Sequence, residues 1–299
     1  MADRTIIRTW PIRGTLHFVA ADDARWMLEL LTPRVIASTA PRHRELELDA
    51  SIFTKSGKLL VRALRDGRAV SRPRLYEILN AAGIATDGSR GLHILAYHAQ
   101  RQLICFGPRE GKQPTFVLFD KWIPGAKSRS REDALAELAT RYFTGHGPAT
   151  VQDFAWWSGL AAADARVSLE LAKPGLTSEA VDGRAYWFVP SSGRSRAKPV
   201  GEHLLPPFDE YTVAYRDRSA VEDPAHRMRV NAGGGMVNPI IVIGGRVVGT
   251  WKRAIKKDAV VVTLMPFATF AQSDLDVLEA AARRYGRFLG RPAVMNVVT

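Results

Sequence analysis

The sequence has a single cysteine among 299 residues, and this scarcity limits the chemistry that the chain can perform. Cys105 lies in the apolar run LICFG. One thiol cannot close a disulfide within the chain, and it cannot supply the several thiolates of a zinc or iron–sulfur site. A lone thiol also fits a reducing compartment. We therefore expect a cytoplasmic protein without a thiolate-bound metal.

Long apolar runs are also missing from the sequence. The first residues, MADRTIIRTWPIRG, lack the apolar core of a signal peptide, and no later stretch approaches the roughly 20 apolar residues that cross a bilayer. We expect a soluble protein with no membrane partner.

Acidic residues are outnumbered by basic ones. There are 30 Asp and Glu against 42 Lys and Arg, a formal net charge of 42 − 30 = +12. Such a charge attracts polyanions and repels cationic partners. Nucleic acid is the leading partner class.

The first half of the chain predicts a mixture of strands and helices. Residues 5–19 are rich in β-branched and aromatic residues and predict a strand, followed by a helix in AADDARWMLELL. From 50 to 107 the order is helix, turn, helix and hairpin, with GLHILAYH and QRQLICFGP as the two strands. This is the order of a winged helix, with residues 71–83 as its recognition helix.

The same order of elements recurs from 131 to 190. A helix with a Gly stop is followed by a short helix in TVQDFAWWSGL, a third helix, and a hairpin that turns at Asp-Gly. Basic linkers precede and follow this segment. The last hundred residues then alternate strand-like runs with Gly-rich turns and close on the helix DLDVLEAAARRYGRFLG.

These patterns together predict an α+β protein with tandem winged-helix domains and a small β-rich domain with a C-terminal helix. We divide the chain into residues 1–49, a remnant of a first winged helix, then 50–125 and 131–190, each a winged helix, and 200–299, the β-rich domain. Residues 5–19 are expected to expose a strand edge or to pair elsewhere in the protein.

The stretch GHGPATVQDFAWWSGL raises the question of a catalytic pocket. We expect Thr150 to cap a helix and Asp153 to reach back to the cap, as in a capping box. Phe154 and Trp157 share a helix face that is typical of a core, whereas Trp156 faces elsewhere. His146 fits a turn residue, so the stretch favours a structural role.

A cluster of arginines in RALRDGRAVSRPR indicates DNA binding more strongly than the preceding segment indicates catalysis. Guanidinium groups pair with phosphate oxygens in a bidentate manner, and a helix N-terminus adds positive charge. A solvated surface patch is the alternative. The cluster, with the basic residues of the two linkers and of the RGTLH segment, gives our predicted DNA-binding residues, which are Arg13, His17, Arg62, Arg65, Arg68, Arg72, Arg74, Lys127, Arg129, Arg194 and Arg196.

One acidic pair, Asp209 and Glu210, follows two prolines in LLPPFDEYTVAYRDR. Carboxylates repel the DNA backbone, so the pair does not favour a phosphate contact. The pair could hydrogen-bond a flipped base, orient a water molecule, or form salt bridges with Arg216 and Arg218. Asp209 and Glu210 are our candidate catalytic residues, although the loop fits a supporting role better.

The chain resembles the bacterial winged-helix family that includes the AlkZ-like and YcaQ-like DNA glycosylases. The motifs that carry the resemblance are RTWPIRGTLHFV, YFTGHGPATVQDFAWWSGL, LLPPFDEYTVAYRDR and GGRVVGTWKR, spread in this order over the chain. The resemblance implies tandem winged helices around a DNA duplex, a barrel-like β domain, and neither a metal nor an organic cofactor. It also implies excision of alkylated purines or unhooking of interstrand crosslinks.

The resemblance further implies a catalytic pair, Gln-hydrophobic-Gln or Gln-hydrophobic-Asp, in a helical segment before RGTLH. Here RGTLH begins at Arg13, so we expect that this segment is lacking. The Gln-x-Gln at Gln100–Gln102 has Arg101 in its middle and is predicted to lie in a wing, which indicates coincidence.

Two functions remain open. The first is a glycosylase-like repair protein on double-stranded DNA, alkylated or crosslinked, at the nucleoid. The second is a non-enzymatic DNA binder or transcription regulator, which would prefer one DNA sequence.

Overall fold

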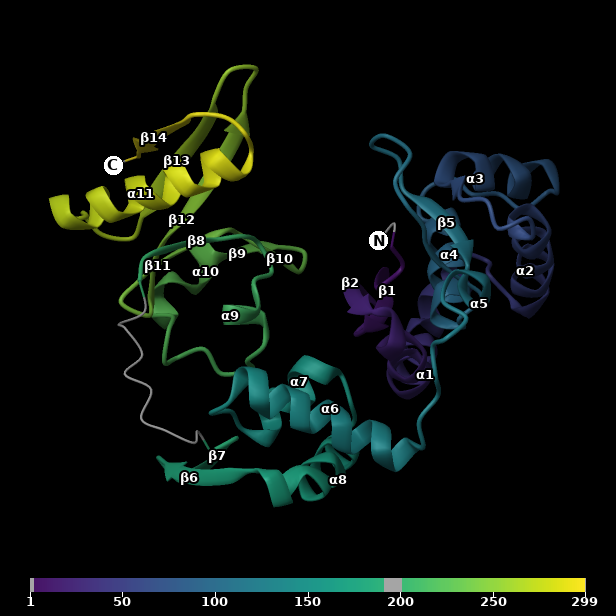
Figure 1. The fold of residues 1–299 in the computed structure, drawn as a ribbon, viewed down its shortest axis with the longest axis horizontal. Helices are drawn as coiled ribbons and strands as arrows, with labels where there is room; N and C mark the ends of the chain where they lie inside the picture. Colours follow the sequence, from purple (N-terminus) through teal and green to yellow (C-terminus); the bar gives the residue numbers. More distant parts are fainter. Residues whose placement is uncertain (1–2, 191–200, 299) are drawn as a thin grey trace. The chain divides into compact units, whose positions relative to one another are not determined.

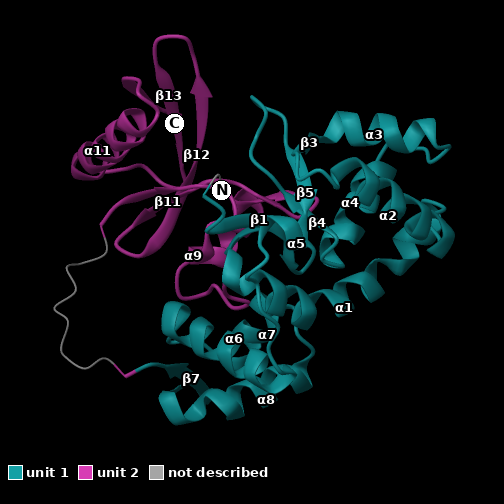
Figure 2. Cartoon of the chain, turned by 45° about the vertical axis from the view of Figure 1, so that its right-hand side comes forward, with its two compact units in different colours: residues 1–189 teal, residues 190–299 magenta. Residues whose placement is uncertain are grey.

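The computed structural model describes residues 3–190 and 201–298, and the chain forms two compact units. Unit 1 covers Met1–Val189 and unit 2 covers Pro190–Thr299 (Figure 2). Both contain helices and strands, which confirms the predicted α+β class. None of the helices in the described ranges combines the length and apolar character that a membrane crossing requires.

Unit 1 contains a five-stranded sheet with the order β2-β1-β4-β5-β3. Residues 5–19 form two strands instead of one, because Arg13 and Gly14 both have positive φ and turn the chain into a tight hairpin. β1 pairs with β4, and β2 is left as an edge. The strands are β1 (Ile6–Ile12), β2 (Thr15–Ala20), β3 (Val70–Ser71), β4 (Ile104–Phe106) and β5 (Thr115–Leu118).

The first helix, α1 (Ala21–Glu45), is longer than the sequence predicts. It continues through Pro33 and Pro41, and it buries Trp26 and Leu28 almost completely. Proline removes one helical hydrogen bond, and tertiary packing along the buried face compensates for that loss.

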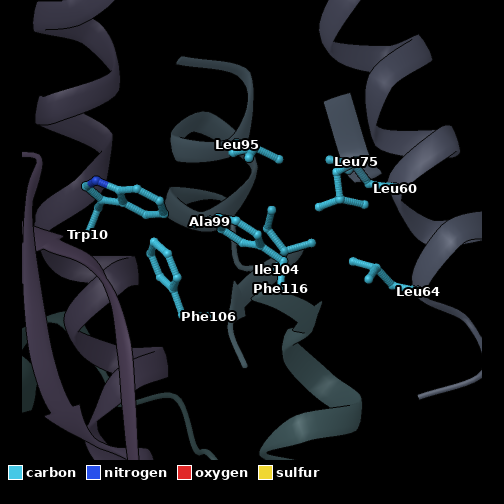
Figure 3. Close-up of a cluster of buried hydrophobic side chains, with 9 residues drawn as sticks. All are labelled: Trp10, Leu60, Leu64, Leu75, Leu95, Ala99, Ile104, Phe106 and Phe116. Atoms are coloured by element: carbon cyan, nitrogen blue, oxygen red, sulfur yellow. The ribbon is translucent and has the colours of Figure 1, made fainter. Parts of the chain in front are cut away.

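Three helices follow in unit 1, α2 (Ala50–Leu64), α3 (Arg72–Ala81) and α4 (Arg90–Gln100). The first two were predicted, but the prediction of a strand at GLHILAYH was wrong. Gly91, Ile94, Leu95 and His98 are all buried, and their spacing is helical. Alternation in a short apolar run does not separate a strand from a buried helix. Side chains from β1, α2, α3, α4, β4 and β5 form one core cluster (Figure 3).

The segment 131–190 folds in the predicted order of elements (Figure 1). Its hairpin turns at Asp182 and Gly183, both with positive φ, as an Asp-Gly turn requires. The elements, with the short helices that flank them, are α5 (Phe119–Trp122), α6 (Arg131–His146), α7 (Val151–Ser158), α8 (Ala162–Ala172), η1 (Lys173–Gly175), β6 (Thr177–Val181) and β7 (Arg184–Phe188).

Unit 2 contains a five-stranded open sheet with the order β14-β13-β12-β11-β8. The expected barrel-like closure is wrong, because β8 and β14 are the two ends of this sheet. Its strands are β8 (His203–Leu205), β11 (Ile240–Ile243), β12 (Arg246–Ile255), β13 (Val260–Pro266) and β14 (Ala293–Val297).

A long helix of unit 2, α11 (Gln272–Phe288), packs Leu278 and Ala282 against Trp251 and Val262 of the sheet. The expectation that this helix is the last element was wrong, because β14 follows and pairs parallel to β13. The remaining elements are α9 (Glu210–Val213), η2 (Pro224–His226), α10 (Arg227–Val230), β9 (Asn231–Gly233) and β10 (Met236–Val237).

Candidate nucleic-acid interface

The predicted arginine cluster lies on one continuous, exposed part of unit 1. It runs from the last turn of α2 through the connection to β3 and into the first turn of α3. β3 pairs with β5, and the backbone N–H of Arg72 donates to the carbonyl of Pro114 at 3.1 Å, so this connection is fixed to the sheet. The exposed members are Arg62, Arg65, Arg68, Arg72 and Arg74.

Nearby carboxylates do not cancel this charge. Arg65 lies 3.6 Å from Asp66, and Arg74 lies 2.7 Å from Glu77, but all four side chains are more than 60% exposed. Ion pairs in water contribute little and exchange readily for other partners. Among the described residues, we find no salt bridge for Arg62, Arg68 or Arg72. The cluster therefore keeps most of its positive charge for an anionic ligand.

In a winged helix with this order of elements, the groove-reading position predicted for residues 71–83 would belong to α4. In the order helix, strand, helix, helix and hairpin, the last helix before the hairpin is the second of the helix-turn-helix pair. α4 contacts α1, α2, β1 and β4, and half of its side chains are buried. Its first residue, Arg90, has a side chain only 15% exposed. α4 therefore offers little for reading base edges.

Arg13 has a structural partner in unit 1. Its Nη1 donates to the carbonyl oxygens of Trp156 at 3.0 Å and Trp157 at 2.7 Å, which are two of the last carbonyls of α7. Because helix ends leave such carbonyls without partners, Arg13 caps α7. His17, on β2, shares a 2.8 Å hydrogen bond with Thr15.

The basic residues of the two linkers differ in what the structure shows. Lys127 is exposed. Arg129 pairs with Glu137 at 3.2 Å and lies 5.2 Å above the ring of Trp26, so it also ties the linker to the fold. Arg194 and Arg196 lie outside the described residues.

The turn between β4 and β5, residues 107–114, is a basic segment that the sequence analysis missed. It carries Arg109 and Lys112, both exposed. The sequence pattern predicts this hairpin too early in the chain, because the alternating residues of α4 also fit a strand. The signal was present in PREGKQP, a polar stretch with Pro and Gly between two apolar runs.

Asp209 and Glu210 begin α9 in unit 2. Asp209 Oδ1 accepts a hydrogen bond from the backbone N–H of Tyr211 at 2.9 Å, so Asp209 is the cap of this short helix. Tyr211 Oη donates to the carbonyl of Gly245 at 2.6 Å, which ties α9 to the turn between β11 and β12. Glu210 is exposed.

The Gln-x-Gln sequence lies at the end of α4 and not in a wing, which corrects its predicted place. Gln100 is buried, and its carbonyl accepts a 2.9 Å hydrogen bond from the Thr32 hydroxyl. Gln102 Oε1 accepts from Arg25 Nη1 at 2.9 Å. Gln102 thus bonds to α1 through its side chain, whereas the bond at Gln100 is made by its backbone carbonyl.

The segment GHGPATVQDFAWWSGL serves as a framework, as predicted. Thr150 and Asp153 form a complete capping box at the start of α7. Phe154 is fully buried, whereas Trp156 is 48% exposed. No part of this segment needs a catalytic role to explain its residues.

The comparisons with known proteins agree on one family. A family model described as "DNA glycosylase AlkZ-like" matches residues 1–288. A similar protein, the "Interstrand DNA cross-link repair glycosylase" of Streptomyces sahachiroi, is 27% identical over 315 aligned residues, covering 97% of this chain and 81% of that protein. The solved structure of Streptomyces sahachiroi DNA glycosylase AlkZ matches with a TM-score of 0.75 and 25% identity, covering 99% of this chain and 83% of that one.

These matches do not support the expectation that a catalytic N-terminal segment is lacking. The motifs quoted for the resemblance also meet in pairs in the structure, because Arg13 of RTWPIRGTLHFV contacts Trp157 of YFTGHGPATVQDFAWWSGL. In the same way, Tyr211 of LLPPFDEYTVAYRDR contacts Gly245 of GGRVVGTWKR. Because the family model matches nearly the whole chain, the chain belongs to the AlkZ-like DNA glycosylase family.

Proposed function

We propose that this chain holds double-stranded DNA through its phosphates and hydrolyses the N-glycosidic bond of alkylated or crosslinked bases at the nucleoid. The observation that carries the proposal is the family match over residues 1–288, together with the name of the relative, an interstrand DNA cross-link repair glycosylase. The exposed arginine cluster supports the DNA contact.

The arginine cluster supports contact with phosphates more than with bases. Its residues lie on a helix end, a connection and a helix start, which are typical places for phosphate contacts. The helix that would take the groove-reading position, α4, has half of its side chains buried. A repair protein benefits from this arrangement, because a lesion can arise in any sequence.

The chemistry asks little of the protein. An alkylated purine carries a positive charge and leaves as a neutral base, taking the electron pair of the glycosidic bond. Water then bonds to the sugar carbon and gives up a proton. The protein has to place one water molecule, accept the proton and stabilise the cationic sugar. A carboxylate suits the last two tasks, and Asp209 and Glu210 remain our candidates for them.

The cap geometry indicates different roles for the two candidates, Asp209 and Glu210. Asp209 holds the start of α9 through Tyr211, which suits a residue that positions its neighbours. Glu210, the exposed first residue of α9, is the better candidate for contact with the reacting sugar.

An excision assay tests this function. A duplex with one 7-methylguanine is incubated with the protein, and abasic sites are revealed by strand cleavage in alkali; a crosslinked duplex is assayed for unhooking. We expect cleavage with wild type and strongly reduced cleavage with Glu210→Gln at unchanged DNA affinity. Tight binding without any abasic product would leave a DNA-binding role and exclude the glycosylase.

The transcription-regulator alternative is tested by selection from random duplexes. A regulator would enrich one strong motif. We expect no enrichment.

A further inference from the structure

An exposed aromatic ring and an unpaired arginine lie together at the edge of the unit 1 sheet. Phe18 on β2 is 64% exposed, although most aromatic rings of this unit are buried. It lies directly opposite Arg8 on β1, and Arg8 lies opposite Phe106 on β4. Residues opposite each other in a sheet share a face, so Phe18, Arg8 and Phe106 form one row.

Arg8 is held between two rings. Its guanidinium carbon lies 5.0 Å from the ring centroid of Phe106 and 5.9 Å from that of Phe18. Phe106 is 6% exposed and packs against Trp10 in the core. Arg8 thus marks the boundary between the buried aromatic core and the exposed ring of Phe18.

No acid neutralises Arg8. Within residues 3–190 and 201–298 we find neither a salt bridge nor a hydrogen bond from its guanidinium. Burial lowers the pKa of Arg8, and the positive charge of Arg109 in the β4–β5 turn lowers it further. An anion beside Arg8 would stabilise its positive charge.

We infer that Phe18 is a stacking surface for an unpaired nucleobase and that Arg8 binds the adjoining phosphate. A ring face with cationic groups at its side is the arrangement that proteins use for single-stranded nucleic acid. A nucleotide carries its base and its phosphate on one sugar, so a single unit of the strand can fill both positions. This inference rests on the proposed function, since it takes DNA as the ligand.

The positive charge of the chain favours a polyanion over a second copy of the chain as the ligand of this row. β2 is a sheet edge, and Leu16 and Phe18 are exposed on it, which would otherwise favour strand pairing between copies. Pairing through β2 would bring together two copies of a chain with a net charge of +12. A polyanion has the complementary charge.

The test compares two duplexes of the same sequence, one fully paired and one with a single bulged adenine. Wild type should bind the bulged duplex more tightly. Phe18→Ala should weaken binding to it roughly five- to 150-fold, the range for one lost base–aromatic stack, and leave the paired duplex within about twofold. Phe18→Trp should restore the preference. Arg8→Gln should weaken both duplexes and reduce the salt slope by about one.

Val167→Ala is the matched control, because Val167 is 49% exposed on α8 and does not lie in the row. It should change neither binding constant. Thermal unfolding of each variant shows that it is folded, and Phe18→Trp keeps an aromatic ring if the alanine variant fails to fold.

If wild type binds neither duplex, the proposed function fails. If wild type binds but Phe18→Ala weakens both duplexes alike, or Phe18→Trp behaves as the alanine variant, only this inference is wrong. A wild-type dimer that Phe18→Ala converts to monomer would also overturn it in favour of a second copy.

Discussion

Arg13 Nη1 lies 2.7 Å from the carbonyl oxygen of Trp157, a contact between residues 144 positions apart. It joins the tip of the β1–β2 hairpin to the end of α7, so the first sheet and the second group of helices in unit 1 share a charged hydrogen bond. This relationship gives Arg13 a measurable role in stability, separate from any contact with DNA.

Replacing Arg13 by alanine should lower the free energy of unfolding by about 1–3 kcal/mol, because the variant loses hydrogen bonds from a charged donor to helix-end carbonyls. Urea denaturation of the whole chain measures the change. Arg74→Ala is the control, since Arg74 is exposed and its ion pair with Glu77 lies in water. Equal stability of the Arg13→Ala variant and wild type would mean that the capping bond is not formed in solution.

Gly159→Ala tests the same junction from the other side. Gly159 ends α7 with φ +73°, and a Cβ there would lie 2.9 Å from Arg13 Cγ. The left-handed backbone alone costs about 1–2 kcal/mol for alanine. Gly145→Ala is the matched control, because Gly145 lies in α6 with open space around it, and alanine there should stabilise by about 0.5–1 kcal/mol. A harmless Gly159→Ala would contradict the observed backbone conformation.

Stability should fall as the pH is lowered, because His98 is buried. Burial lowers the pKa of His98 to about 4, and its Nε2 shares a 2.9 Å hydrogen bond with Ser56. The unfolded chain takes up this proton near pH 6.5, whereas the folded protein resists it until about pH 4. The stabilisation from the neutral, buried His98 is therefore complete above pH 6.5 and is lost progressively as the pH falls from 6.5 to about 4.

Between pH 7 and pH 5 this difference amounts to about 2 kcal/mol. Burial also lowers the pKa of His43 and His93, so they act in the same direction. Urea midpoints at the two pH values measure the loss. His98→Gln should flatten the dependence of the urea midpoint on pH. An unchanged slope in His98→Gln would show that His98 is not the group responsible.

Asp209→Asn should retain the fold of α9, because asparagine caps helices as well as aspartate does. Asp209→Ala should cost about 1 kcal/mol. DNA affinity of the asparagine variant should be equal to wild type or slightly higher, because one repulsive carboxylate is removed. Excision that vanishes in Asp209→Asn at unchanged affinity would make Asp209 the catalyst instead of a positioning residue.

Local signals predicted much of unit 1. The helices of residues 131–172 could be placed because Ser130 and Thr150 supply cap hydrogen bonds and Gly159 supplies a left-handed stop. α4 could not, because its apolar residues also alternate along the chain. The open sheet of unit 2 was missed for a different reason. Whether a sheet closes depends on pairing between distant strands, which the pattern within each strand does not contain.

The candidate site also has features that the sequence predicts locally and features that depend on distant residues. Exposure of the arginine cluster followed from its charge density, since unpaired charges stay in water. The capping role of Arg13 depends on a partner 144 positions away, and the row of Phe18, Arg8 and Phe106 depends on strand register. Neither relation has a local signature.

The proposed function depends most on phosphate binding by the arginine cluster. The most direct test titrates two duplexes of unrelated sequence at several salt concentrations, with wild type and with the double variant Arg72→Ala/Arg74→Ala. The matched control is Arg42→Ala/Arg44→Ala on α1, which removes the same charge and, through Arg42 and Glu45, a similar exposed ion pair. We predict that the cluster variant weakens both duplexes equally and lowers the salt slope by about two, and that the control does neither. A loss confined to one sequence, or an equal loss in the control, would contradict the account.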